Sequence, residues 1–315
     1  RMRWRVLVSA PYFQPVLGRF RERFAAHRIE VVVPPVVERL DEDALVPWIS
    51  DVDGAVCGDD AFTDRALSRA PRLRVISKWG TGIDSIDLEA CRRRGIAVRN
   101  TPNAFSEPVA DSVLGYMLAF ARRLPWMDRD MKRGEWTKLP SVSLGELTLG
   151  VIGVGNVGSA VVRRARAFGM RLLGTDVRPL DPALLASTGL VPVPLEDLLS
   201  ESDVVSVNCD LNPTSRGLVE AGVLARMRPT AFLVNTARGP IVDEEALVDA
   251  LRRGAIAGAA LDVFEREPLP ADSPLRSMDN VFLAPHNSNS SPRAWERVHE
   301  STFRNLVEAL EGSAP

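Results

Sequence analysis

A glycine-rich turn between an apolar run and a helical pattern constrains the fold of this chain more than any other feature. Its glycines are Gly153, Gly155 and Gly158, in the spacing G-x-G-x-x-G. In a strand–turn–helix unit the first glycine makes the tight turn, the second lets backbone approach a phosphate, and the third lets helix and strand pack closely. The helix start adds unpaired N–H groups and a positive dipole end, which favour an anion. The turn, with Asn156 and Val157, therefore predicts a site for the pyrophosphate of a dinucleotide.

An acidic residue after the next apolar run narrows the choice of dinucleotide. Asp176 follows Gly158 by eighteen residues, and an acid about 20 residues beyond the turn holds the ribose hydroxyls of NAD in such folds. A carboxylate there repels the 2′-phosphate of NADP. We expect NAD as the cofactor and NADP as the less favoured alternative, because Arg178 lies close enough to weaken the preference.

Composition excludes several other classes of protein. The chain has 315 residues, of which 45% are hydrophobic and 25% charged, and its formal net charge is −2. These values are typical of a globular protein of two domains, and they provide no basic field for nucleic acid or a membrane surface. The three cysteines share no C-x-x-C spacing, and no uncharged run is long enough to cross a membrane. We therefore expect a cytoplasmic protein with reduced cysteines, no metal site, no nucleic-acid partner and no membrane segment.

Short apolar runs alternate with helical patterns along the whole chain. The runs before the glycine turn are 4–9, 29–33, 54–57, 73–77 and 96–98. The runs after it are 170–175, 190–193, 203–207, 231–235, 256–261 and 281–284. Such alternation indicates parallel sheets with helices on both faces. We predict an α/β unit of about a hundred residues, followed by a nucleotide-binding domain of roughly seven parallel strands.

Two longer helical patterns cover Asn103–Arg123, which Pro125 is expected to stop, and Pro292–Leu310. The segment Trp126–Trp136 follows the first of them and carries two tryptophans and two methionines among charged residues. It is expected either to pack on a partner or to pack within its own chain. The sequence favours neither alternative.

Three residues that could carry chemistry follow successive strands of the predicted nucleotide-binding sheet. His286 follows one strand, at the edge where ligands bind in open α/β folds, and its imidazole can titrate near neutral pH. Arg238 follows another and can grip a carboxylate through two parallel hydrogen bonds. Glu267 follows a third. The other two histidines, His27 and His299, are expected on the surface and in a structural role, respectively.

These motifs together resemble the D-isomer-specific 2-hydroxyacid dehydrogenases, in the broad phosphoglycerate dehydrogenase-like group, and the resemblance covers nearly the whole chain. It rests on the glycine turn and on the segments Lys78–Asp87, Asn100–Asn103, Val109–Asp111, Asn235–Asp243, Leu261–Pro268 and Ala284–His286. The resemblance implies an NAD-dependent enzyme that interconverts a D-2-hydroxy acid and its 2-oxo acid by hydride transfer, similar to phosphoglycerate dehydrogenase or hydroxypyruvate and glyoxylate reductases.

The resemblance also implies three catalytic residues. Arg238 would bind the carboxylate and carbonyl oxygen of the substrate and polarise the carbonyl group. His286 would give a proton to that oxygen during reduction and take it back during oxidation. Glu267 would hydrogen-bond His286, orient it and stabilise its protonated form.

Further residues would hold the ligands. Asp262, helped by backbone near Ala237, would hold the carboxamide of the nicotinamide. Trp79 and the Gly80-Thr81-Gly82 turn would form the substrate site, with the backbone N–H groups of the turn directed to the carboxylate.

The family's architecture implies a flavodoxin-like substrate domain, residues 1–99 plus 289–315, into which a Rossmann NAD-binding domain, residues 100–288, is inserted. Both would be doubly wound parallel-sheet domains. Family members are usually homodimers through the Rossmann domain, and the Trp126–Trp136 segment fits such an interface.

Several points stay open at the level of sequence. Asn208 and Asp210 stand where the family commonly has His and Pro, and Tyr12, Phe13 and Trp79 line the substrate pocket or belong to the core. The acid itself is not determined. Two other functions compete with the dehydrogenase: an NAD(H)-sensing, corepressor-like binding protein, and a dehydrogenase of another anion such as formate or phosphite.

Overall fold

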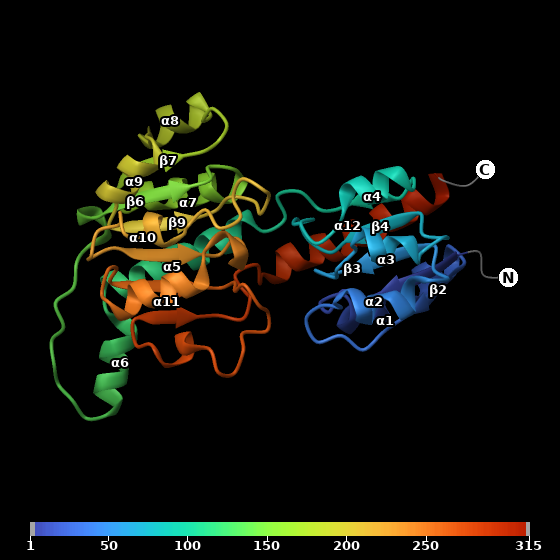
Figure 1. The fold of residues 1–315 in the computed structure, drawn as a ribbon, viewed down its shortest axis with the longest axis horizontal. Helices are drawn as coiled ribbons and strands as arrows, with labels where there is room; N and C mark the ends of the chain where they lie inside the picture. The colour runs from blue at the N-terminus through green and yellow to red at the C-terminus, as the bar shows by residue number, and fades with distance from the viewer. Residues whose placement is uncertain (1–3, 313–315) are drawn as a thin grey trace. The chain divides into compact units, whose positions relative to one another are not determined.

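The computed structural model describes residues 4–312 of the chain. The chain forms two compact units, Arg1–Phe105 with Ser291–Pro315 (unit 1) and Ser106–Ser290 (unit 2), as Figure 1 shows by colour along the chain. The predicted domain boundaries lie between 99 and 100 and between 288 and 289; residues 1–3 and 313–315 of the predicted substrate domain lie outside the described part. The roles predicted for the two domains stay predictions.

Unit 1 is built on a five-stranded sheet of order β2-β1-β3-β4-β5, with every pair parallel. This is the doubly wound order 2-1-3-4-5 of flavodoxin-like folds. The strands are β1 (Trp4–Val8), β2 (Ile29–Val32), β3 (Gly54–Cys57), β4 (Val75–Lys78) and β5 (Ala97–Arg99). The helical segments are η1 (Gln14–Val16), α1 (Leu17–Ala26), α2 (Glu42–Ile49), α3 (Asp64–Ser68), α4 (Leu88–Arg93) and α12 (Pro292–Gly312).

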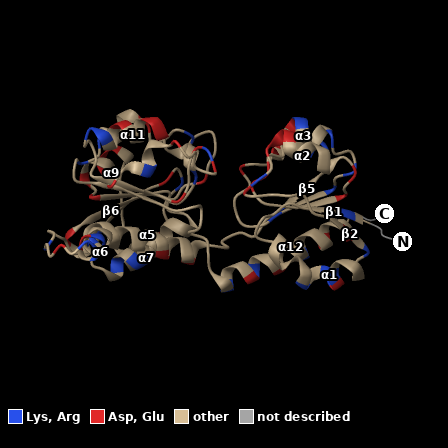
Figure 2. Ribbon diagram, turned by 90° about the horizontal axis from the view of Figure 1, so that it is seen from below, with Lys and Arg blue, Asp and Glu red and all other residues tan. Residues whose placement is uncertain are grey.

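Helix α12 returns to unit 1 from the far end of the sequence and covers one face of its sheet together with α1, while α2 and α3 cover the other face (Figure 2). Val298, Leu306 and Leu310 on α12 are fully buried, at the spacing of one helix face. The hydroxyl of Ser77 in β4 donates to the carbonyl oxygen of Thr302 at 2.8 Å, with both groups buried. The apolar face of α12 is thus part of the core of unit 1.

Unit 2 contains a seven-stranded parallel sheet of order β12-β11-β10-β9-β6-β7-β8. Its strands are β6 (Thr148–Ile152), β7 (Arg171–Thr175), β8 (Val191–Pro192), β9 (Val204–Val207), β10 (Phe232–Asn235), β11 (Gly258–Leu261) and β12 (Val281–Leu283). The order reverses between β6 and β9, and such a switch point opens a crevice at the carboxyl ends of the strands, where ligands bind in these folds.

Helices cover both faces of this second sheet (Figure 2). One face carries α5 (Ser106–Ala121), α6 (Leu124–Lys132), α7 (Asn156–Ala167) and α8 (Pro182–Thr188), and the other α9 (Leu195–Glu201), α10 (Ala221–Leu224) and α11 (Glu244–Arg252). Short 3-10 turns lie at η2 (Leu144–Glu146), η3 (Gly239–Ile241) and η4 (Pro274–Ser277). The predicted fold class, two doubly wound parallel-sheet α/β domains, is confirmed.

The chain departs from the predicted pattern at Pro125. We expected this proline to stop the long helix, but the break lies earlier, at Arg123, whose φ of 56° is left-handed. Pro125 instead lies in the first turn of α6, where its missing N–H would have no partner in the helix. Proline therefore starts the second helix here rather than ending the first.

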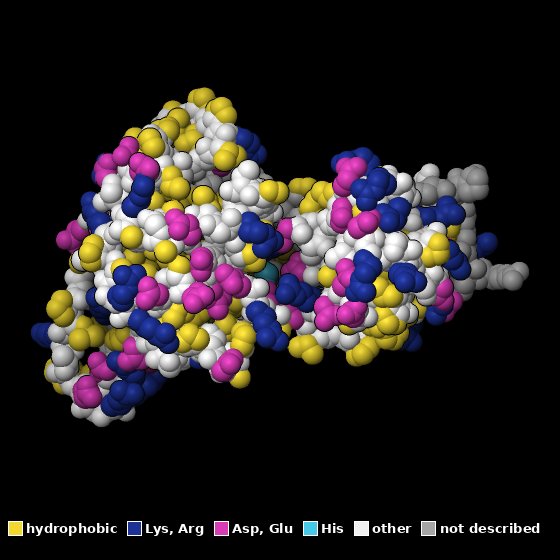
Figure 3. Space-filling model, in the orientation of Figure 1, with side chains coloured by type: hydrophobic (Ala, Val, Ile, Leu, Met, Phe, Trp, Pro, Cys, Tyr) yellow, Lys and Arg dark blue, Asp and Glu magenta, His cyan; other side chains and the backbone are white. Residues whose placement is uncertain are grey.

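The surface of unit 2 in Figure 3 shows acidic and basic side chains interspersed, without a wide area of one sign. Within residues 4–312, none of the helices combines the length and the hydropathy needed to cross a membrane.

Candidate active site

The glycine turn joins β6 to α7, as the sequence predicts, and its geometry excludes larger residues. Gly153 has a φ of 85°, in the left-handed region. A Cβ on Gly158 would lie 2.1 Å from the carbonyl oxygen of Gly153, so helix and strand could not approach as they do. At Gly155 the only heavy atom within 4 Å of such a Cβ, in the described part of the chain, is Nη2 of Arg178 at 3.7 Å. The turn therefore has no space for a side chain at Gly158, whereas space remains beside Gly155.

Asp176 follows β7 and contacts the same turn. Its carboxylate accepts the backbone N–H of Val154 at 2.8 Å and that of Arg178 at 3.0 Å. Burial alone would raise the pKa of this carboxyl, but these two N–H groups and the charge of Arg178 outweigh it and leave the pKa below its ordinary value. The open glycine, the first turn of α7 and this charged acid fit a dinucleotide with free ribose hydroxyls.

Arg238 follows β10 in a turn that Asn235 holds from both sides. The side-chain oxygen of Asn235 accepts the N–H of Ala237 at 3.1 Å, and its amide nitrogen donates to the carbonyl oxygen of Arg238 at 3.0 Å. The next residue, Gly239, packs against the backbone of Phe264 so closely that a Cβ would lie 1.9 Å from it. This contact brings the loop after β10 against the loop after β11.

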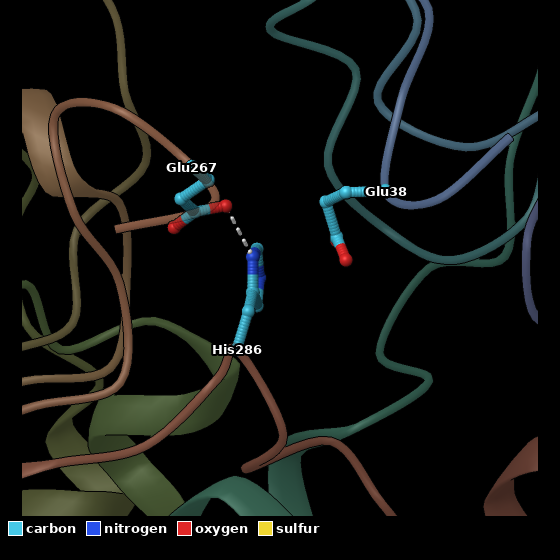
Figure 4. Close-up of side chains that lie close together, drawn as sticks. All are labelled: Glu38, Glu267 and His286. Carbon is cyan, nitrogen blue, oxygen red and sulfur yellow. Dashed lines mark hydrogen bonds and ion pairs between the residues drawn. The ribbon is translucent and has the colours of Figure 1, made fainter. Parts of the chain in front are cut away.

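His286 and Glu267 come from the loops after β12 and β11 and meet at the carboxyl edge of the sheet. Oε2 of Glu267 lies 2.9 Å from Nδ1 of His286, and the two side chains are 12% and 18% exposed (Figure 4). The other carboxylate oxygen of Glu267 accepts the N–H of Phe264 at 3.0 Å. Glu267 is thus fixed to its own loop and presents one oxygen to Nδ1 of the imidazole ring.

Asp262 directly follows β11 and is buried, with 1% of its surface exposed. Its carboxylate accepts the backbone N–H groups of Asn287 and Ser288, each at 2.8 Å. The structure thus ties Asp262 to the loop that carries His286, while its predicted contact with the cofactor stays a prediction.

In unit 1, the predicted substrate residues follow β4. The indole of Trp79 is buried, with 3% of the residue exposed, and its N–H donates to Nδ1 of His299 at 2.9 Å. Thr81 is exposed, and its hydroxyl donates to the carbonyl oxygen of Thr101 at 2.9 Å. Among the described residues, no acceptor receives the backbone N–H of Thr81 or Gly82. These two N–H groups are therefore available to an anion.

The comparison with known proteins decides the family. Residues 114–288 match the family described as D-isomer specific 2-hydroxyacid dehydrogenase, NAD binding domain. The chain belongs to this family. It is an enzyme, an NAD-dependent oxidoreductase that interconverts a 2-hydroxy acid and its 2-oxo acid.

Relatives of this dehydrogenase cover its whole length. The chain is 38% identical to a glyoxylate reductase of Korarchaeum cryptofilum over 327 aligned positions, which include 100% of this chain and 95% of the relative. It is 38% identical to a D-3-phosphoglycerate dehydrogenase of Methanocaldococcus jannaschii over 90% of this chain, but over only 54% of that longer protein. A D-lactate dehydrogenase from Aquifex aeolicus, solved with NAD and lactic acid, superposes with a TM-score of 0.87 at 28% identity, over 98% of this chain and 96% of that one.

The structure assigns the remaining sequence candidates to structural contacts. His27 lies 2.7 Å from a carboxylate oxygen of Glu311 on the surface of unit 1, and His299 is buried beside Trp79. Phe13 is fully buried in the core of unit 1, which settles the open alternative for that residue. In the Trp126–Trp136 segment, Trp126 packs on Phe120 and Phe282, with ring centroids 5.6 Å and 5.2 Å away, whereas Trp136 is 83% exposed. Trp126 thus follows the intramolecular alternative, and packing of the segment on a partner stays a prediction.

Sequence reasoning missed two contacts of candidate residues in this dehydrogenase. Asn235, which organises the Arg238 turn, could have been found from the Asn-Thr-Ala sequence after a strand, because asparagine side chains bond backbone two residues on. The buried ammonium of Lys78, 3.0 Å from a carboxylate oxygen of Asp59, lies directly before the Gly80-Thr81-Gly82 turn. Nothing in the sequence pairs these two residues.

Proposed function

We propose that this dehydrogenase interconverts a small, unphosphorylated D-2-hydroxy acid and its 2-oxo acid, of the size of glyoxylate or hydroxypyruvate. The observation that carries the proposal is the hydrogen bond between Glu267 and Nδ1 of His286 at the carboxyl edge of a sheet that also carries the glycine turn. A carboxylate that holds an imidazole by one nitrogen makes the other nitrogen a defined proton donor and acceptor.

Three side chains share the chemistry in this proposal. Arg238 binds the substrate carboxylate and polarises the carbonyl group. Its guanidinium group has parallel N–H donors that can hydrogen-bond to oxygens of this kind. His286 gives a proton to the carbonyl oxygen during reduction and takes it back during oxidation. Glu267 stabilises the protonated ring through its negative charge. Bound NADH supplies the hydride for the reduction.

The residues that would hold the cofactor belong to unit 2, the predicted dinucleotide-binding domain. The turn at Gly153, Gly155 and Gly158 takes the pyrophosphate, together with backbone at Asn156 and Val157. Asp176 takes the ribose hydroxyls, and its lowered pKa keeps it charged at working pH, which favours NAD over NADP.

Unit 1 is proposed as the substrate domain, and two of its features support a small acid without a phosphate. The N–H groups of Thr81 and Gly82 suit a carboxylate. The nearby ammonium of Lys78 already pairs with Asp59 and donates to the carbonyl oxygen of Trp79 at 3.1 Å, so it is not a free cation for a phosphate. A relative that aligns with this chain over 95% of its own length is named glyoxylate reductase, in agreement with this size class.

The proposed assembly is a homodimer through unit 2, and the proposed location is the cytoplasm. Trp136, Met131 and Leu124 are 83%, 52% and 52% exposed near α6, and exposed apolar groups of this kind favour burial against a second copy. All three cysteines are free, which agrees with a reducing compartment. Analytical ultracentrifugation of Trp136→Ser tests the assembly: a monomer supports this interface, and an unchanged dimer contradicts it.

The activity is tested by NADH oxidation with a panel of 2-oxo acids, with and without phosphate groups, in wild type and His286→Ala. We expect turnover of glyoxylate or hydroxypyruvate and a loss of about 10²–10⁴-fold in the variant. The matched control is His27→Ala, at a half-exposed histidine of unit 1 that contacts Glu311. Binding of NADH without turnover of any acid would instead support a nucleotide-sensing protein, and oxidation of formate or phosphite alone would support the other class of dehydrogenase.

A further inference from the structure

The glycine turn lies between two loops that each carry an acidic residue. The sheet order places β6 between β9 and β7, so the turn that follows β6 has one of their loops on either side. Asp176 directly follows β7, and Asp210 lies three residues beyond the end of β9. The carboxyl ends of parallel strands share one edge of a sheet. Both acids therefore belong to the edge where the turn lies.

Backbone contacts continue this arrangement beyond the strand ends. The N–H of Asn208 donates to the carbonyl oxygen of Ile152 at 2.8 Å, which extends the pairing of β9 with β6. The next residue, Cys209, packs so closely on Gly153 that a Cβ on this glycine would lie 2.6 Å from the backbone nitrogen of Cys209. Asp210 therefore follows a residue that is in contact with the turn.

The backbone of Asp210 is fixed by its own loop, whereas its carboxylate is not. The hydroxyl of Ser215, a buried residue, donates to the carbonyl oxygen of Asp210 at 2.5 Å and accepts the N–H of Asn212 at 2.9 Å. The side chain of Asp210 is exposed, and among residues 4–312 no hydrogen-bond donor or cation contacts its carboxylate. Its negative charge is therefore not neutralised by a partner.

Both carboxylates act electrostatically on the thiol of Cys209. Burial raises the pKa of this thiol to about 11, and the negative charges of Asp210 and Asp176 each add to the rise. Asp176 is also bound to the turn itself, because its carboxylate accepts the N–H of Val154 at 2.8 Å. An anion bound in the space beside Gly155 would therefore lie in the field of two carboxylates.

We propose that Asp210 is a second determinant of cofactor choice, which disfavours the 2′-phosphate of NADP from the loop after β9. The proposal rests on the proposed function for the placement of the cofactor at the glycine turn. A 2′-phosphate adds about one to two negative charges near pH 7, and a carboxylate repels it through solvent without touching it. Arg178, whose Nη2 lies 3.7 Å from a Cβ built on Gly155, attracts the same phosphate, and Asp210 offsets that attraction.

The ligands 5′-AMP and adenosine 2′,5′-bisphosphate test the proposal, because they differ only in the 2′-phosphate. Their dissociation constants are measured by calorimetry at about 20 and about 200 mM salt, since the repulsion by an exposed charge is screened by ions. The variants are Asp210→Asn, which removes the charge, and Asp210→Glu, which keeps it. Asp279→Asn is the matched control, because Asp279 is an exposed acid that precedes β12, at the opposite edge of the same sheet.

We expect Asp210→Asn to lower the ratio of the bisphosphate Kd to the AMP Kd by about threefold to tenfold at low salt and by less at high salt. The Kd of AMP itself should stay within about twofold of wild type, and Asp210→Glu should keep the wild-type ratio. In the double variant Asp176→Asn/Asp210→Asn, the ratio should fall below that of Asp176→Asn alone.

An unchanged ratio in Asp210→Asn, or an equal fall in Asp279→Asn, would overturn the proposal. Equal weakening of both ligands would overturn it too, because Asp210 would then be a contact of the adenosine rather than a charge against the phosphate. The ratio is measured without turnover. It therefore supports the role of Asp210 even if His286→Ala retains full activity, an outcome that would sink the proposed function alone.

Discussion

Glu267 connects the ring of His286 to the backbone of the neighbouring loop. One carboxylate oxygen lies 2.9 Å from Nδ1 of His286, and the other accepts the N–H of Phe264 at 3.0 Å. The side chain therefore has little freedom to turn away from the imidazole, and its charge is placed against a group that titrates near neutral pH.

Replacing Glu267 by Gln removes the charge and keeps the shape. A carboxylate favours the protonated imidazole, so its loss lowers the pKa of His286. The rate of reduction, which needs this proton, then begins to fall at a lower pH. We expect kcat for reduction to fall by about tenfold or more near pH 7. The measurement is kcat against pH at saturating NADH. Glu265→Gln is the matched control, because Glu265 in the same loop contacts Glu244 instead; equal effects of the two changes would refute the assignment.

Asp176→Asn should relax the choice between NADH and NADPH. The asparagine amide keeps one acceptor oxygen for the turn but lacks the charge that repels a 2′-phosphate. Arg178 lies beside residue 176 and can bind that phosphate. We expect the ratio of kcat/KM for NADPH to that for NADH to rise about tenfold, or about 1.4 kcal/mol. Arg178→Ala in the same background should reverse the gain. A ratio that stays constant would show that cofactor choice lies elsewhere.

Gly158→Ala should damage the cofactor site through the backbone. The added Cβ meets the carbonyl oxygen of Gly153 at 2.1 Å, so helix α7 must move away from β6. We expect a loss of about 1–3 kcal/mol in the free energy of unfolding and weaker binding of NADH by calorimetry. Gly115→Ala on the exposed face of α5 is the control, since a Cβ there meets nothing within 4 Å and should stabilise the helix by about 0.5–1 kcal/mol. Normal NADH affinity in Gly158→Ala would be inconsistent with this geometry.

His299 should make stability depend on pH. Burial lowers the pKa of His299 in the folded chain below the ordinary value of 6.5, so the unfolded chain takes up the proton first as the pH falls. The contribution to stability is complete above about pH 6.5 and is lost toward the lower pKa of the folded state. Chemical unfolding between pH 5 and 8 should therefore give a flatter profile in His299→Gln than in wild type. A wild-type slope in His299→Gln would disprove the effect.

The sequence by itself determined the fold class and the candidate residues of the chemistry. Strands and helices alternate with short connections, and a parallel sheet is the arrangement that buries such units. The spacing of Gly153, Gly155 and Gly158 is a local property of one turn, so it can be recognised from neighbouring residues alone. Arg238, Glu267 and His286 were found because each follows a strand, and the carboxyl ends of parallel strands share one edge.

Tertiary structure decided the contacts between segments distant in the sequence. The bonds of Asp262 to the loop after His286 join residues 25 and 26 positions apart, and the pairing of Lys78 with Asp59 joins β4 to the loop after β3. The burial of Trp79 against His299 depends on a helix from the other end of the chain. Local pattern cannot predict these contacts, because the orientation and burial of a side chain depend on which surfaces the whole fold brings together.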